Sequence, residues 1–584
     1  MVIATQKNAV VCLPARQAGG RGIRGFHLAL LAGTAVGAAA CLVPQSARAF
    51  NLYTGTYSDQ TLTINLETEL EYSTIYRVND PSAIIAGPQD ANQNDGDLDF
   101  RHGFVDNTFT VTPVFDLKYG NYGVHISGDA YLDTPYLGKS QNNSPGTYNP
   151  YSTGSNRDFT SATRNINGQN AELLDAFAYG TQEFGADDEQ SLEVKFGRQT
   201  LLWGQSLFFT NNGLAAGQAP IDVITAEDLA NPQSQQVFLP VGQAVVTYQP
   251  ARGINIQGYY QFEWQPDNLQ GVGSYFSTTD ILDKGGERAI LASVPGFGTF
   301  YSYRNADLRP PSQNGQFGLS VQATLGEWDL GLYGLRYDSK APEVYTFLQP
   351  GFLAQTSPGN LLSKGVYQAG YYQLVYPRDI QIYGASFSTN LGAANVAGEV
   401  STRRNMPLVS GAGDDGVDGL VAPVGTFANA STAPLYAVGN TFAAQVSAIY
   451  VTSGVPLDPG GITITGETEF NHLIGVTENR AALAPGRQGS AAAFEVVATP
   501  TYYDVLPNFV LTFPIGIEYN VLGRSEIDST MQHGTGNFTF GVTGTYESNW
   551  IAGLTYKDYL GKADTVYNSA VDRGYLSLNL QHTF

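Results

Sequence analysis

The chain has 584 residues and a formal charge of −22, because 52 acidic residues outnumber 30 basic ones. Such acidity argues against nucleic acid as a partner. The two cysteines, Cys12 and Cys41, both lie near the N-terminus, so we expect neither disulfides nor a thiolate metal site in the rest of the chain. No apolar run of about 20 residues follows them, which excludes membrane-spanning helices but not a closed β-barrel.

The first 49 residues have the features of a secretory signal. They contain five bases and no acid, then an apolar run over 26–43, then the small-x-small triplet Ala47-Arg48-Ala49. This order predicts cleavage before Phe50, which leaves 50–584 as one domain with a charge of −27 once the five bases are removed. A lipoprotein signal ending at Cys41 is the alternative, but it lacks the Leu expected three residues before the Cys.

After residue 60 the chain alternates apolar and polar residues with the period of two that a β-strand requires. In the first such stretch, 61–78, Leu62, Ile64 and Leu66 share one face, and the other face carries acids. In the last, 574–584, Leu576, Leu578 and Leu580 alternate with polar residues. The remaining strands are predicted near 108–119, 122–133, 170–184, 189–199, 242–250, 253–264, 315–325, 327–338, 378–390, 392–404, 440–452, 461–473, 492–502, 507–521, 535–546 and 548–559.

The connections between these strands alternate between short and long. Short turns such as 120–121 and 251–252 are followed by long segments, among them 79–107, 134–169, 200–241, 265–314 and 339–377. This rhythm is typical of a transmembrane antiparallel β-barrel of about 18 strands, with short periplasmic turns and long extracellular loops. Residues 50–60 are a short lead, too small for a plug domain. The chain ends on the aromatic Phe584, which we interpret as the signal read by the barrel-assembly machinery.

Several segments, taken in order, resemble the Gram-negative outer-membrane family catalogued as domain of unknown function 1302. They are Asn94-Asp-Gly-Asp-Leu-Asp-Phe100, Gly197-Arg-Gln199 with Trp203-Gly204, Asn211-Asn-Gly-Leu214, Pro220-Ile-Asp222, Phe238-Leu-Pro-Val241, Gly258-Tyr-Tyr-Gln-Phe-Glu-Trp264, Ser274-Tyr-Phe-Ser-Thr-Thr-Asp280 and Tyr376-Pro-Arg-Asp379 before Tyr383-Gly384. The resemblance implies a porin-sized barrel, associated in many members with exporters and lipid-handling periplasmic proteins. The sequence departs from the family over 214–219, where a second Asn is expected.

Strand parity predicts which side chains face the lumen, and acids outnumber bases among them. A water-filled lumen accepts such charges, whereas a dry core does not, and an acidic lumen favours cations or neutral solutes over anions. The predicted pore-lining residues are Glu67, Glu69, Glu71, His125, Asp129, Glu193, Lys195, Glu263, Glu399, Arg403, Glu467 and Glu469.

The segment 200–241 is predicted to fold into the lumen and set its width. It is long for a connection, and it begins with apolar and aromatic residues that an exposed loop would not favour. A barrel of this size without an inward obstruction would be an open aqueous pore. The predicted constriction residues are Trp203, Phe208, Phe209, Asn211, Asn212 and Asp222. The alternative is that Phe208 and Phe209 pack on the rim.

Two other site chemistries receive little support. Asp90, Asn92, Asn94 and Asp95 resemble a calcium loop, but the glycine comes one place late and no Glu follows at the twelfth position, so no cofactor is expected beyond this weak calcium site. His125, Ser127 and Asp129 share one face, about 6.6 Å apart from one to the next, which is too far for a catalytic triad.

The sequence therefore predicts an outer-membrane channel for passive passage of small neutral, cationic or apolar solutes, and not an enzyme. One alternative is an outer-membrane component that exchanges lipids or hydrophobic compounds with a periplasmic lipid-handling protein or exporter. A membrane-embedded hydrolase is the other. We expect outer-membrane lipid and lipopolysaccharide to surround the barrel, and the acidity leaves open divalent cations that bridge acidic loops to lipopolysaccharide.

Overall fold

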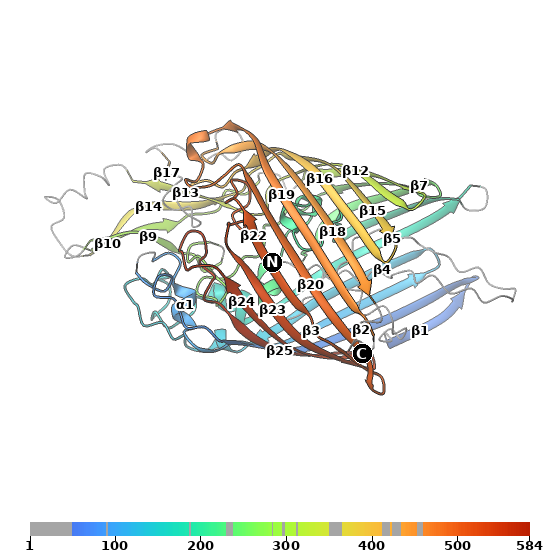
Figure 1. The fold of residues 1–584 in the computed structure, drawn as a ribbon, viewed down its shortest axis with the longest axis horizontal. Helices are drawn as coiled ribbons and strands as arrows, with labels where there is room; N and C mark the ends of the chain where they lie inside the picture. The colour runs from blue at the N-terminus through green and yellow to red at the C-terminus, as the bar shows by residue number, and fades with distance from the viewer. Residues whose placement is uncertain are drawn as a thin grey trace.

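The computed structural model describes residues 50–88, 91–185, 189–228, 238–282, 284–294, 298–310, 314–349, 365–411, 421–422, 434–452 and 460–584. The predicted signal segment and Cys12 and Cys41 lie outside these residues. Within them the dominant element is one large antiparallel sheet closed on itself (Figure 1).

This sheet is a transmembrane β-barrel of 18 strands, as the alternation predicts. In chain order the barrel strands are β2 (Gln60–Arg77), β3 (Gly103–Tyr119), β4 (Tyr122–Asp133), β5 (Gln169–Phe184), β6 (Gln190–Gln199), β7 (Val241–Ala251), β8 (Ile254–Gln261), β11 (Gln316–Leu325), β12 (Trp328–Tyr337), β15 (Ile380–Leu391), β16 (Ala394–Pro407), β18 (Val438–Thr452), β19 (Ile462–Glu478), β20 (Ser490–Leu506), β21 (Phe509–Thr512) continued by β22 (Ile515–Leu522), β23 (Gly536–Tyr546), β24 (Trp550–Leu560) and β25 (Tyr575–Thr583). β21 and β22 form one strand, which is interrupted at Pro514 because proline has no backbone N–H to donate.

The barrel closes where β25 pairs with β2, from Glu69 opposite Thr583 to Arg77 opposite Tyr575. The polar residues of β25 turn inward: Ser577, Asn579 and Gln581 are 1–6% exposed. Its leucines at 576, 578 and 580 turn outward and are 38–45% exposed. An apolar outer face and a polar inner face are what a lipid-embedded barrel requires.

The lead before the barrel forms a strand that the sequence did not predict. β1 (Phe50–Tyr57) turns back on β2 and pairs with it from Tyr57 opposite Gln60 to Phe50 opposite Leu66. It therefore occupies the part of the β2 edge that β25 does not reach. The backbone N–H of Phe584 donates to Thr68 O at 3.0 Å, so the chain end meets β2 directly beside the start of β1.

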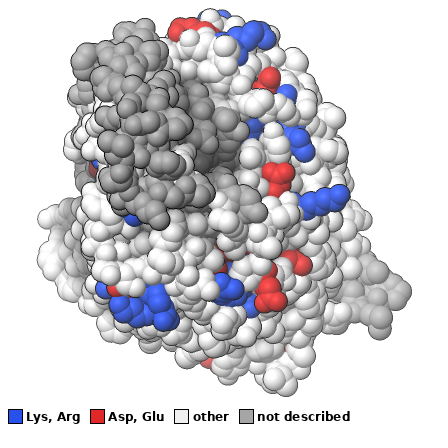
Figure 2. Space-filling model, turned by 90° about the vertical axis from the view of Figure 1, so that its left-hand side faces the viewer, with Lys and Arg blue, Asp and Glu red and all other residues white. Residues whose placement is uncertain are grey.

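Two connections predicted as loops contain most of a second sheet. β9 (Arg288–Val294), β10 (Gly298–Arg304), β13 (Glu343–Leu348), β14 (Gly365–Val375) and β17 (Val421–Ala422) form five strands in the order β17-β13-β14-β10-β9, with β10–β14 and β13–β17 parallel. The sheet extends from one end of the barrel (Figure 1). That end is seen face-on in Figure 2, where charged side chains form scattered groups on a mostly uncharged surface.

The extracellular loops pack on one another over the barrel end. An aromatic cluster of Phe100, Tyr136, Phe159, Tyr275 and Phe276 joins three of these loops to the ends of β2, β3 and β25. The helices are short: α1 (Asp95–Asp99), α2 (Ser161–Thr163) and α3 (Val223–Asp228). None of the helices in the described residues is long and apolar enough to span a membrane.

Candidate pore

Part of the connection between β6 and β7 lies inside the barrel. The segment 204–217, here called the finger, leaves and rejoins the wall at one place, because the backbone N–H of Trp203 donates to Gln218 Oε1 at 2.5 Å. The base of the finger is held by Lys340, whose Nζ donates to Gly217 O at 3.1 Å, and by Gln261, whose Nε2 donates to Gln218 O.

The tip of the finger is bound by an inward carboxylate of β19. Glu467 is 2% exposed and accepts the backbone N–H groups of Leu207, Phe208 and Phe209 at 2.5–3.1 Å. Hydrogen bonds from several N–H groups to a carboxylate are among the stronger kinds in proteins. The carboxylate of Glu467 on β19 and the backbone N–H groups of the turn at 207–209 are therefore each other's hydrogen-bond partners.

Glu399 on β16 holds the two sides of the finger together. Its Oε2 accepts the N–H of Gln205 at 2.6 Å, and its Oε1 accepts that of Leu214 at 2.9 Å. Gly204 has a φ of +106°, and a Cβ there would lie 2.3 Å from Glu399 Oε2. The close approach of the backbone to the carboxylate therefore requires glycine at this position.

Two further polar residues on the same wall complete the attachment. Glu469 accepts a hydrogen bond from Asn212 Nδ2 at 3.0 Å, and Arg403 donates to the carbonyl oxygens of Asn211 and Gly213 at 3.2 and 2.8 Å. The finger thus uses acids to bind N–H groups and an arginine to bind carbonyl groups.

Apolar contacts fix the finger at both ends. Trp203, at the base, packs on Tyr259 and Tyr333 with ring centroids 5.1 and 5.8 Å apart, and its Nε1 donates to Gln257. Leu207 and Phe208, at the tip, pack against Ile449 of β18 and Val497 of β20. The finger therefore runs along the inner face of the wall from β8, β11 and β12, past β16, to β18, β19 and β20.

Asp222 lies at the start of α3, beyond the finger. It is 4% exposed, and its Oδ1 accepts the N–H of Thr225 at 3.1 Å. Desolvation raises the pKa of Asp222 from 3.8 to about 7, and the negative charge of Glu172 adds to the shift. The side chain therefore titrates near neutral pH.

Away from the finger, acids face one another across neighbouring strands. Asp129 on β4 pairs with Glu172 on β5, and Glu495 on β20 pairs with Glu518 on β22. Neither carboxylate oxygen of Glu71, which is 2% exposed, accepts a hydrogen bond from the described residues. Like charges directly opposite each other are unfavourable in a sheet, and in the described part of the sheet no base is paired with these acids across the strands.

The other residues predicted to line the pore lie inward, and most of them form ion pairs or hydrogen bonds with side chains of the barrel wall. His125 contacts Asp116 at 2.7 Å, Glu193 pairs with Lys195 at 3.4 Å, and Glu263 pairs with Arg198 at 3.0 Å. Glu69 accepts a hydrogen bond from Gln581 at 2.6 Å. Glu67 is half-buried on β2. Whether these side chains meet a solute stays a prediction.

Sequence reasoning missed three acids of the lumen wall, Glu172, Glu495 and Glu518. A bulge shifts the β4–β5 register between Ile126 and Gly128, which changes the inward parity next to Glu172. The stretch around Glu495 alternates poorly because small Ala residues at 491–493 carry no clear apolar signal. Glu518 could have been identified from the alternation around it, because Ile515 and Ile517 precede it at outward-facing positions of its strand.

The described residues of the proposed calcium loop have protein hydrogen-bond partners, and calcium binding there stays a prediction. Asn92 Oδ1 accepts hydrogen bonds from Asn149 and from the N–H of Ile290, and Asn94 donates to Gly87 O. Asp95 accepts hydrogen bonds from Asn142 and Asn149. Asp90 lies outside the described residues. Among the residues described, no three of His, Cys, Asp and Glu gather into a metal-holding group.

His125 and Ser127 have different partners, which bears on the hydrolase alternative. His125 contacts Asp116 on β3, whereas Ser127 Oγ accepts the N–H of Asp175 on β5 at 3.1 Å. The two side chains therefore do not form the hydrogen bond that a nucleophile and its base require.

The closed strands and the finger define a transmembrane β-barrel whose lumen contains a folded segment of its own chain. The chain belongs to the family described as protein of unknown function (DUF1302), whose model matches residues 30–584. The resemblance seen in the sequence motifs is thereby confirmed. No curated protein matches the chain.

The solved structures to which the chain is similar include three porins. OccAB2 of Acinetobacter baumannii is 9% identical with a TM-score of 0.41, over 89% of this chain and 98% of that one. A BenF-like porin of Pseudomonas fluorescens is 10% identical with a TM-score of 0.40, over 90% and 98%. OccK2 of Pseudomonas aeruginosa, solved with glucuronate, is 8% identical with a TM-score of 0.40, over 92% and 99%.

Proposed function

We propose that the protein is a channel of the bacterial outer membrane that passes small neutral or cationic solutes passively and catalyses no reaction. The observation that carries the proposal is the inward pairing of acids, Asp129 with Glu172 and Glu495 with Glu518, beside a finger that occupies part of the lumen. Rings of carboxylates in a confined pore favour cations and repel anions.

Some acids of the barrel wall bind the finger and others do not, and this difference supports cation selectivity. Glu399 and Glu467 are occupied by the finger, so their charges are largely compensated by N–H groups. Glu71 and Asp129 each retain at least one carboxylate oxygen with no hydrogen-bond donor among the described residues. The acids that the finger does not bind are therefore the ones that a passing cation would meet.

The test is the reversal potential of single channels in a KCl gradient. The expected result is a preference for K⁺ over Cl⁻ that falls in the double variant Glu71→Gln/Asp129→Asn. Glu327→Gln, in an exposed turn between β11 and β12, is the matched control and should leave selectivity unchanged. Preference for Cl⁻, or equal selectivity in the double variant and the parent, would contradict the proposal.

Swelling of liposomes that contain the purified protein tests the solute class. A neutral sugar should enter faster than a sugar acid of the same size, and a small amine should enter at least as fast as the neutral sugar. Faster entry of the sugar acid would contradict a channel in which carboxylates of the wall select the solute.

A further inference from the structure

A hollow of about 540 Å³ lies on the outer wall of the barrel near its extracellular end. One side is formed by outward-facing residues of β2 and β3, including Tyr72 and Phe104, which are 40% and 62% exposed. The other side is the segment 134–141 that follows β4, including Gly138 and Lys139. Since outward positions of a barrel contact lipid, this hollow opens at the level of the outer leaflet.

The outer wall near the hollow is apolar and aromatic. Tyr76 packs edge-on against Phe104 with centroids 5.3 Å apart, and Phe109 and Leu132 are 48% and 45% exposed. Aromatic residues at this depth are typical of the girdle where hydrocarbon gives way to headgroups. An acyl chain would lie against these residues, which places its headgroup beside the segment 139–143.

Bases surround that segment. Arg101 Nη1 donates to Asn143 Oδ1 at 3.1 Å, and Arg157 Nε donates to Ser140 O at 2.9 Å. Lys139 forms an ion pair with Asp158, which also lies 3.8 Å from Arg164. Four bases, Arg101, Lys139, Arg157 and Arg164, thus lie around this segment together with Asp158 and the buried Asp95 and Asp99, in a chain whose net charge is −22.

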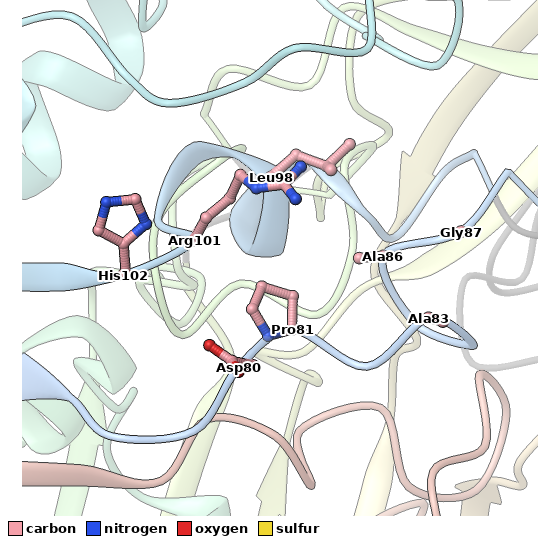
Figure 3. A pocket seen from close by; sticks show the side chains of 8 residues that line it. All are labelled: Asp80, Pro81, Ala83, Ala86, Gly87, Leu98, Arg101 and His102. Atoms are coloured by element: carbon pink, nitrogen blue, oxygen red, sulfur yellow. The ribbon is translucent and has the colours of Figure 1, made fainter.

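Arg101 lines a second hollow of about 470 Å³, which Figure 3 shows from close by. Arg101 and His102 lie on one wall of the second hollow, and Asp80, Pro81 and Ala83 lie on the other. Gln141 accepts from the N–H of His102 and donates to its carbonyl, which fixes the position of Arg101 relative to Lys139.

The one acid in the lining of the first hollow contributes little charge. Asp99 is 3% exposed. Burial, reinforced by the charge of Asp280, raises the pKa of Asp99 well above 3.8 and favours its neutral form. The mouth of the hollow is therefore positively charged and its wall is aromatic.

We propose that the outer-wall hollow binds a phosphorylated glycolipid of the outer leaflet, with an acyl chain on Tyr72 and Phe104 and a phosphate between Lys139 and Arg101. The aromatic wall accounts for the acyl chain, and the excess of bases on an otherwise acidic protein accounts for the phosphate. Arginine and lysine are the usual phosphate-binding side chains.

The test uses bisphosphorylated lipid A and the same lipid with its phosphates removed, each added to the full-length barrel and counted as adducts by native mass spectrometry. The double variant Arg101→Glu/Lys139→Glu should bind the phosphorylated lipid about tenfold more weakly, which corresponds to one broken charge-assisted contact or more. The control Arg309→Glu/Arg480→Glu changes the same charge on other extracellular loops and should bind as the parent does.

A second variant tests the hollow itself. Gly138 has no heavy atom closer than 3.6 Å to a Cβ built on it, so Gly138→Phe should fill the hollow, leave the barrel assembled and reduce binding. Assembly is checked by heat-modifiable migration in gels. Equal binding of the two lipids, equal binding by the double variant and its control, or displacement by inorganic phosphate at the lipid's own concentration would each overturn the proposal.

Discussion

Glu467 shows how one side chain can hold a segment inside the barrel. Its single carboxylate receives three consecutive backbone N–H groups of the finger. The Glu467→Gln variant keeps the size of the side chain but loses one acceptor oxygen and introduces a donor that faces other donors. We expect larger and noisier single-channel currents, because buried N–H groups left without acceptors destabilise the bound finger.

The matched control for this change is Glu193→Gln. Glu193 also faces the lumen, but its partner is Lys195 and not the finger. Identical current noise in the two variants would show that the charge itself, and not its contact with the finger, controls the current.

Asp222 should make the channel sensitive to pH. The pKa of Asp222 is raised from 3.8 to about 7 in the folded protein. The stability that comes from its protonation is therefore fully present below about pH 4. That stability is lost as the pH rises to about 7. Above pH 7 a buried charge lies near Asp129 and Glu172. We therefore expect currents to become larger and less steady from pH 5 to 8, measured in planar bilayers.

Asp222→Asn removes the titrating group and keeps a side-chain oxygen that can accept from Thr225. Its currents should be nearly constant across the same range. A pH response as strong as that of the parent would assign the effect to other groups.

Individual pore residues were predictable only where apolar and polar residues alternate regularly along the strand. The alternation around Glu399 and Glu467 is clear, so both were expected to face inward. Their binding to backbone N–H groups of the finger was not predictable, because it joins residues about 190 to 260 positions apart. Long-range partners of this kind are set by tertiary packing, which local patterns do not encode.

At the scale of elements, the seam between β25 and β2 depends on the chain end. The N–H of Phe584 continues the ladder to Thr68 O, and His582 stacks on Trp550 and contacts the Phe584 ring, with centroids 4.0 and 4.4 Å apart. Deletion of Phe584 should sharply lower the amount of assembled barrel while secretion to the periplasm continues.

Heat-modifiable migration of the membrane fraction measures this, with Phe584→Trp as the control that keeps an aromatic end. Full heat-modifiable migration of the truncated chain would show that the last residue is not an assembly signal.

Signal cleavage is predicted before Phe50, from the triplet Ala47-Arg48-Ala49. In the structure Phe50 pairs with Leu66 in β1. N-terminal sequencing of outer-membrane material should therefore begin at Phe50. A start at residue 1, or a lipid on Cys41, would contradict the predicted cleavage.

The barrel strands could be predicted because each buries one face and exposes the other to lipid, so period two persists along their length. β1 and the extracellular sheet were missed for different reasons. β1 has only eight residues and is mostly exposed, so it carries weak alternation. The strands β13 and β14 are buried on both faces in places, as at Tyr345 and Tyr372, which removes the alternation altogether.

At the scale of the whole molecule, the barrel wall and the finger have separate roles. The wall supplies a closed ladder of hydrogen bonds, and the finger occupies part of the lumen that the wall encloses. The finger rejoins the wall at its own base, where Trp203 and Gln218 meet. It can therefore be removed without cutting any strand.

The most direct measurement is the single-channel conductance of a barrel in which 205–216 are replaced by a short Gly/Ser link. Trp203 and Gln218 are retained, so the base should remain closed, and heat-modifiable migration confirms assembly. If the finger narrows the lumen, conductance should rise several-fold, because the cross-section open to ions becomes larger. Unchanged conductance in an assembled barrel would contradict a finger that constricts the pore.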